Sequence, residues 1–146
     1  MKRAFVRPLF VLAGLYDFVA GLIGLLAYRP IYRSLGVPLA SQPAYVYFGA
    51  SVLCIFGIGF WLVAIAPRRN SDIITMGVML KLAFSGIVCL SRLRGPISPV
   101  WLVAAGIDVA FAIAFLATRG ADAATITGYP IPLDARRFEP PRVHSR

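Results

Sequence analysis

The stretch IITMGVMLKLAFSGIVCLSRL, residues 73–93, decides the fold. It is a long apolar run with a single lysine, Lys81, in its first half. A run of this length is typical of a membrane-spanning helix. A lysine inside such a helix costs about 2.5–3.5 kcal/mol on insertion, so it needs a partner. We expect the partners to be Asp17 and Asp108, the only other charged residues placed inside apolar runs.

The composition of the whole chain supports the same interpretation. The chain has 146 residues, of which 59% are hydrophobic and 14% are charged, with a mean hydropathy of +0.78. A soluble domain carries about a quarter charged residues. The sequence therefore predicts one domain of a polytopic membrane protein.

The formal net charge of +9 could indicate a nucleic-acid partner. However, the basic residues flank the apolar runs, as Arg29 with Arg33 and Arg68 with Arg69 do. This is the placement that lipid headgroups and the positive-inside rule favour. We therefore expect membrane lipids as partners and no nucleic acid.

Turn residues and prolines divide the chain into an all-α, four-helix transmembrane bundle over residues 1–119 and a tail over residues 120–146. Four prolines and glycines punctuate the first connection, Arg29–Pro43, so we expect no long helix to run through it. Ile31, Tyr32 and Leu35 are spaced to form a short interfacial helical turn there. The predicted spans are residues 9–28, 44–66, 73–93 and 99–118.

The tail is rich in proline and arginine, so we expect it to be extended and cytoplasmic rather than a fifth span. It could order along a partner protein. With four spans, the two termini and the middle loop share one side, which carries ten basic residues against four. We therefore expect a bacterial inner-membrane protein with both termini in the cytoplasm. The candidate partner-binding residues of the tail are Tyr129, Arg136, Arg137 and Arg142.

The three intramembrane charges are expected at one depth. Counted from the cytoplasmic ends of their spans, all three lie roughly 12–15 Å into the bilayer at 1.5 Å per residue. Small residues share a helix face with each charge, which allows helices to approach closely. These stripes are Gly14, Gly21 and Gly24 beside Asp17; Gly77, Ser85 and Cys89 beside Lys81; and Ala104, Ala105 and Ala112 beside Asp108.

Two carboxylates facing one ammonium leave an excess negative charge, which a low-dielectric interior disfavours. Either one carboxyl group is protonated, or another donor assists. By residue type, the candidate donors are Tyr16, Tyr47, Ser51 and Ser85.

Three functions remain open on the sequence alone. The first is a non-catalytic membrane subunit or scaffold, which binds other membrane subunits through its glycine-rich helix faces and its tail, and whose charges pin the helices in register. The second is a small transporter that uses the charge network to bind a proton, an anion or a lipid headgroup. The third is a quinone- or lipid-processing enzyme. Because His144 is the only histidine and no nucleophile or phosphate-loop motif is present, we expect no catalytic residues, no metal and no cofactor.

The pattern across residues 10–118 resembles the small four-span bacterial membrane proteins of the broad DoxX-like type. This resemblance implies the four-helix fold. Some DoxX-like proteins are membrane subunits associated with thiosulfate or quinone oxidation, but this chain has no redox motif that would carry such chemistry. The features that carry the resemblance are Leu15-Tyr16-Asp17, Tyr28-x-Pro30, Leu35-Gly36-x-Pro38, Gly77-x-x-x-Lys81-Leu82 and Asp108.

Overall fold

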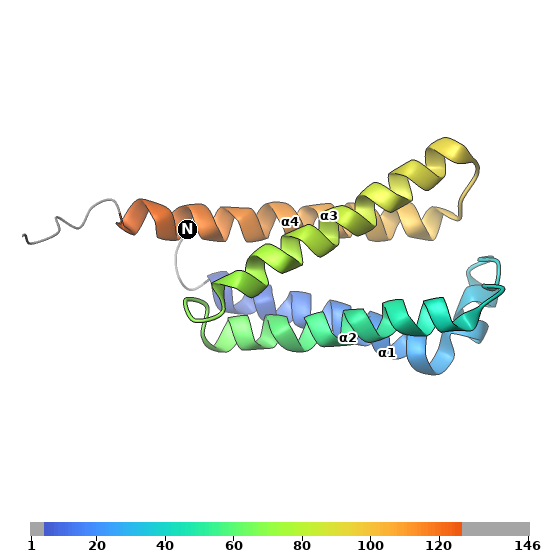
Figure 1. Cartoon of the computed structure of the whole chain (residues 1–146), viewed down its shortest axis with the longest axis horizontal. Coiled ribbons are helices and arrows are strands. Elements are labelled where there is room, and N and C mark those ends of the chain that lie inside the picture. The colour runs from blue at the N-terminus through green and yellow to red at the C-terminus, as the bar shows by residue number, and fades with distance from the viewer. Residues whose placement is uncertain (1–4, 127–146) are drawn as a thin grey trace, which may run out of the picture.

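Four long helices make up the structure. The computed structural model describes residues 5–126, with side chains through residue 118. Over this range the chain is all-α, as the sequence predicted, and its helices run in antiparallel succession (Figure 1). They are α1 (Val6–Ser34), α2 (Pro43–Ile65), α3 (Ser71–Arg94) and α4 (Pro99–Ile126).

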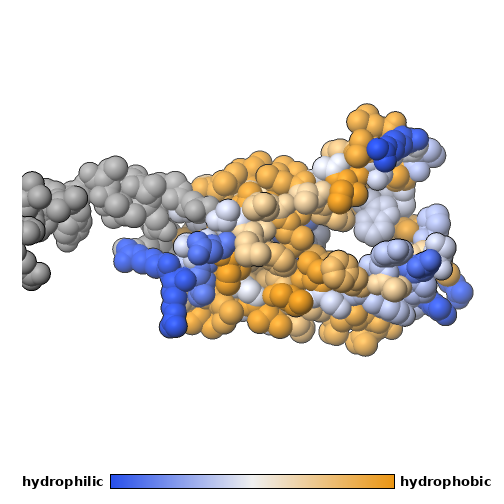
Figure 2. Space-filling model, in the orientation of Figure 1, coloured by the Kyte–Doolittle hydropathy of each residue, from blue (hydrophilic) through white to orange (hydrophobic). Residues whose placement is uncertain are grey.

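The surface of these helices is that of a multi-pass membrane protein. Each helix is long and apolar enough to cross a membrane. Figure 2 shows an apolar band around the middle of the molecule, with hydrophilic residues at the two ends. Large apolar side chains such as Leu26 and Ile65 are 77% and 76% exposed. Lipid, rather than water, suits such a surface.

The predicted first connection, Arg29–Pro43, is too long, because α1 continues to Ser34. The helix kinks at Ala27, where φ is −139° and ψ is 22°. Pro30 explains the kink. It lacks the N–H that would bond to the carbonyl of Leu26, and its ring presses on that same turn. The predicted interfacial turn is therefore the final, kinked segment of α1.

Gly36 ends α1. Its φ of +64° lies in the left-handed region that glycine adopts without strain. The N–H of Val37 donates to the carbonyl of Tyr32 at 2.8 Å, and the N–H of Gly36 donates to that of Arg33 at 3.2 Å. These two bonds form a Schellman motif, which satisfies carbonyls that the helix end leaves free.

The predicted boundary of the tail also needs correction. We expected helix to stop at residue 118 and extended chain to begin at residue 120, but α4 continues to Ile126. The run ADAATI, residues 121–126, has no proline or glycine to stop a helix. Tyr129, Arg136, Arg137 and Arg142 lie outside the described residues.

The helices form two pairs, α1 with α2 and α3 with α4, and backbone contact is most extensive within each pair. Glycines bring α1 and α2 together: Gly14, Gly21 and Gly57 have no room for a side chain. The glycine stripe of α1 thus packs within the chain. Trp61 Nε1 adds a hydrogen bond to the carbonyl of Val11 at 3.3 Å.

A serine hydroxyl contributes to the contact between the helices of the second pair. Ser85 Oγ of α3 donates to the carbonyl of Ala105 of α4 at 3.2 Å. Gly77, Lys81 and Ser85 are buried as one stripe of α3. Cys89, which we assigned to the same stripe, is exposed. The stripe therefore ends one turn earlier than the sequence predicted.

An aromatic core joins the two pairs at the end where α1 begins and α4 ends. Phe10, Phe60 and Phe115 are all 0% exposed. The ring centroids of Phe10 and Phe115 are 4.6 Å apart, and those of Phe60 and Phe115 are 5.0 Å apart. Such ring pairs add roughly 0.5–1.5 kcal/mol each beyond area burial. This end of the molecule is consequently closed.

The pairs separate toward the opposite end. In Figure 1, α3 starts beside the end of α2 and rises away from it along its length. Figure 2 shows a hollow between the two pairs at the end that carries the α1–α2 and α3–α4 connections. The bundle is thus closed at one end and open at the other.

We predict that Gly57→Ala destabilises the bundle by about 1–3 kcal/mol, as overpacking does. The new Cβ would lie 2.8 Å from the carbonyl oxygen of Gly14 and from Phe18 Cβ. Gly86→Ala is the matched control, because its Cβ meets nothing within 4 Å. Reversible unfolding in mixed dodecyl maltoside–SDS micelles measures both. Equal stability of the two variants would contradict the α1–α2 packing.

Candidate functional site: a buried charge triad below an apolar cavity

Lys81 is the centre of the site. Its ammonium nitrogen lies 2.6 Å from Asp17 Oδ1 and 2.8 Å from Asp108 Oδ1. The three side chains come from α3, α1 and α4, so the structure brings together all three charges that the sequence singled out. The contact with Asp108 lies within one helix pair. The contact with Asp17 joins the two pairs.

The triad is almost completely removed from solvent. The side chains of Lys81 and Asp17 are 0% exposed, and that of Asp108 is 8% exposed. Withdrawing ions from water costs several kcal/mol each, and close pairing offsets this cost only with good hydrogen bonds. The short distances at Lys81 meet that condition for one oxygen of each acid, since charge-assisted bonds of about 2.7–2.9 Å are the strong ones.

Two aromatic rings complete the surroundings of the ammonium. Its nitrogen lies 5.1 Å from the ring centroid of Tyr16 and 5.6 Å from that of Phe111. The negative face of an aromatic ring attracts a cation at this range. The two rings also contact each other, with centroids 5.6 Å apart.

One carboxylate oxygen has no partner. Asp17 Oδ2 is buried and accepts no hydrogen bond. A carboxylate has about four lone-pair sites, and Lys81 uses only one oxygen of Asp17. The triad therefore leaves one carboxyl oxygen unsatisfied inside the bundle.

None of the four predicted polar donors bonds to a carboxylate of the triad. Ser51 Oγ bonds to the carbonyl of Tyr47 on its own helix. Tyr47 packs its ring edge-on against Tyr28, with centroids 5.5 Å apart. Ser85 bonds to the backbone of α4. Tyr16 alone reaches the charges, through its ring.

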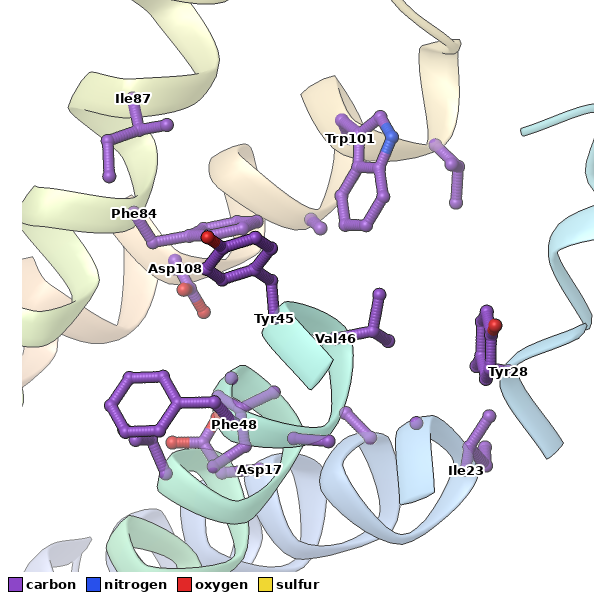
Figure 3. Close-up of a pocket in the computed structure, with 18 of the residues that line it drawn as sticks. Asp17, Ile23, Tyr28, Tyr45, Val46, Phe48, Phe84, Ile87, Trp101 and Asp108 are labelled. Atoms are coloured by element: carbon purple, nitrogen blue, oxygen red, sulfur yellow. The ribbon is translucent and has the colours of Figure 1, made fainter. Parts of the chain in front are cut away.

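A cavity of about 710 Å³ occupies the space between the separating helix pairs. All four helices contribute to its wall, together with Leu35 and Val37 of the first connection. In Figure 3, Asp17 and Asp108 lie on one side of the cavity, and Trp101 and Tyr28 lie on the other.

The wall is mostly aromatic and aliphatic. In this wall the ring of Tyr32 forms two edge-to-face pairs. Its centroid lies 5.6 Å from that of Tyr28 and 5.9 Å from that of Trp101. From the sequence, Tyr32 was expected in a short interfacial helical turn. Periodicity could not reveal that these rings face inward, because an aromatic residue near a helix end suits a headgroup and a cavity mouth equally well.

The cavity is bordered by the acids of the triad and not by its base. Asp17 and Asp108 belong to the lining, whereas Lys81 does not. The ammonium is enclosed by the carboxylates and by the rings of Tyr16 and Phe111. A molecule in the cavity therefore approaches Asp108 first, because it is the only acid of the triad with an exposed side-chain surface.

The cavity has the composition of a ligand-binding site, with many apolar residues and few polar ones in its lining. The described residues hold no group of three metal-ligating side chains. Cys54 and Cys89 are both free thiols. A site with a large apolar wall and a few convergent polar atoms is the usual form of a small-molecule binding site.

Comparisons with protein-family models, with curated proteins and with solved structures gave no match to this chain. The class of protein therefore follows from the fold and the site alone. It is a four-helix integral membrane protein with a partly open cavity that Asp17 and Asp108 border.

We predict that Lys81→Met destabilises the protein by about 3–5 kcal/mol, the usual cost of leaving buried charges uncompensated. Adding Asp17→Asn and Asp108→Asn to the same chain should restore at least half of that loss, because no net charge then remains buried. Unfolding in mixed micelles measures both variants. If the single variant is as stable as the wild type, or the triple variant is no better than the single, the ion-pair account is wrong.

Proposed function

We propose that this chain binds an amphiphilic small molecule within the membrane and acts as a small carrier, with the charge triad as the polar end of its site. The observation that carries the proposal is a cavity of about 710 Å³ whose apolar wall ends on two buried carboxylates. Its volume lies within the range of roughly 300–1,000 Å³ typical of ligand sites.

Helix arrangement supports a carrier rather than a simple binding protein. The cavity opens at one end only, while the rings of Phe10, Phe60 and Phe115 close the other. Contact between the two helix pairs is limited, so the pairs can rotate relative to each other about this aromatic core. Rigid-body rocking of two units around a central site is how many transporters alternate access. With both termini in the cytoplasm, the opening faces the far side of the membrane.

The non-catalytic membrane subunit remains a second hypothesis. The structure reduces the surfaces through which such a subunit could bind its partners. The glycine stripe of α1 packs against α2, so it is not free to contact another subunit. What remains is the tail, whose proposed partner-binding residues lie outside the described residues. The DoxX-like resemblance is compatible with either hypothesis and favours neither.

The test is binding of tritiated twelve-carbon probes to the full chain in lipid nanodiscs, measured by scintillation proximity against protein-free discs. The probes are dodecylamine, dodecanol and dodecanoate. We expect at least one to bind saturably, at one molecule per chain. Ala104→Trp, which fills part of the cavity, should weaken this binding at least tenfold, because Ala104 belongs to the lining.

Ala110→Trp is the matched control. Ala110 lies on the same helix but is exposed and outside the lining, so the same enlargement should leave binding unchanged. The absence of saturable binding for all three probes would contradict the proposal, as would equal effects of the two tryptophans.

A further inference from the structure

We propose that the ligand of this cavity is a cationic amphiphile, an apolar molecule with a protonated amino group that hydrogen-bonds to the carboxylate of Asp108, the exposed acid of the triad. This inference rests on the proposed function and names the ligand class for the same site.

Charge balance is the first argument. The triad has two carboxyl groups and one ammonium, so it carries a net negative charge when both acids are ionised. A low-dielectric interior disfavours an uncompensated charge. A second ammonium supplied by the ligand would neutralise the group. A carboxylate or phosphate would instead add to the excess.

Accessibility is the second argument. Asp17 and Asp108 belong to the cavity lining and Lys81 does not, but the side chains of Asp17 and Lys81 are both 0% exposed. Lys81 contacts only Oδ1 of each acid. Asp108 is the member of the triad that keeps exposed surface, at 8% of its side chain. An incoming group therefore meets the carboxylate of Asp108 before it meets the protein's own donor.

The aromatic wall is the third argument. The lining includes the rings of Tyr16, Tyr28, Phe84 and Trp101. Rings of this kind stabilise a cation that has left water, through the negative charge on their faces. The protein already uses them in this way, since Lys81 Nζ lies 5.1 Å from the ring centroid of Tyr16.

Arginines at the open end do not reverse this preference. Arg29 lies twelve residues beyond Asp17 and Arg92 eleven beyond Lys81, which places them about 16–18 Å away along their helices at 1.5 Å per residue. The Debye length at physiological ionic strength is about 8 Å. Both side chains are exposed at the end of the bundle, where solvent and headgroups screen them.

The experiment compares the three probes at pH 8, where dodecylamine is protonated and dodecanoate is ionised. Their identical chains hold the apolar contribution constant. We expect dodecylamine to bind at least tenfold more tightly than dodecanol, and dodecanoate to bind most weakly. Each dissociation constant is the probe concentration at half-saturation, to which only folded protein contributes. Partial unfolding of a sample therefore lowers the maximum signal but does not change the ratio of the dissociation constants.

Asp108→Asn should reduce the amine-to-alcohol preference at least fivefold, because the new side chain carries no charge to pair with an ammonium. Asp17→Asn, with the same expected result, is the second variant if Asp108→Asn does not fold. Asp72→Asn is the matched control, because Asp72 is an exposed acid in the first turn of α3, outside the cavity lining. It should keep the wild-type preference.

The outcomes separate the two proposals. Saturable binding that Ala104→Trp abolishes, but without preference for the amine, would overturn the cationic ligand and keep the carrier. A preference for the amine that survives both Asp108→Asn and Asp17→Asn would also overturn it, because the carboxylates would not be its cause. No saturable binding by any probe would overturn both proposals.

Discussion

The contact between Lys81 and its two acids is the interaction on which the rest of the structure depends. An ammonium at mid-membrane depth is costly unless it is paired, and its partners come from two other helices. The bond to Asp108 fixes α3 against α4, and the bond to Asp17 ties that pair to α1 where the two pairs begin to separate. The same contact sets the depth of the cavity, because its acids border the wall. One ion-pair group thus determines both helix register and site chemistry.

The two ends of the bundle divide the tasks of stability and function. At the closed end, the stacked rings of Phe10, Phe60 and Phe115 and the aliphatic residues around them leave little free space. At the open end, Pro30 kinks α1 and Gly36 ends it, and the following residues return over the cavity mouth. Packing holds the first region, whereas separation of the helices defines the second. The proposed carrier function would use both regions, since one end must stay shut while the other admits ligand.

Much of this could be predicted from the sequence, because hydropathy and charge are strong constraints in a membrane. The apolar runs predicted four helices, and the positions of Lys81, Asp17 and Asp108 predicted their convergence, since equal depth follows from counting residues. The sequence analysis failed where geometry depends on packing between helices. It treated Pro30 as a stop although a helix tolerates a kink there, and it ended the last helix before Ile126. It also missed Phe10 and the cavity, because an inward-facing ring and a lipid-facing ring have the same residue type.

Solid-state NMR tests the triad most directly, because Lys2 and Lys81 are the only lysines of the chain. In a Lys2→Arg background, the ¹⁵Nζ signal of a lysine-labelled sample in lipid belongs to Lys81 alone. With ¹³Cγ-labelled aspartate, rotational-echo dephasing should show two carboxyl carbons within about 4 Å of this nitrogen, as hydrogen-bonded pairs require. Asp17→Asn, whose side chain carries no label, should remove one of the two. A Lys81 nitrogen with no nearby carboxyl carbon would contradict the account.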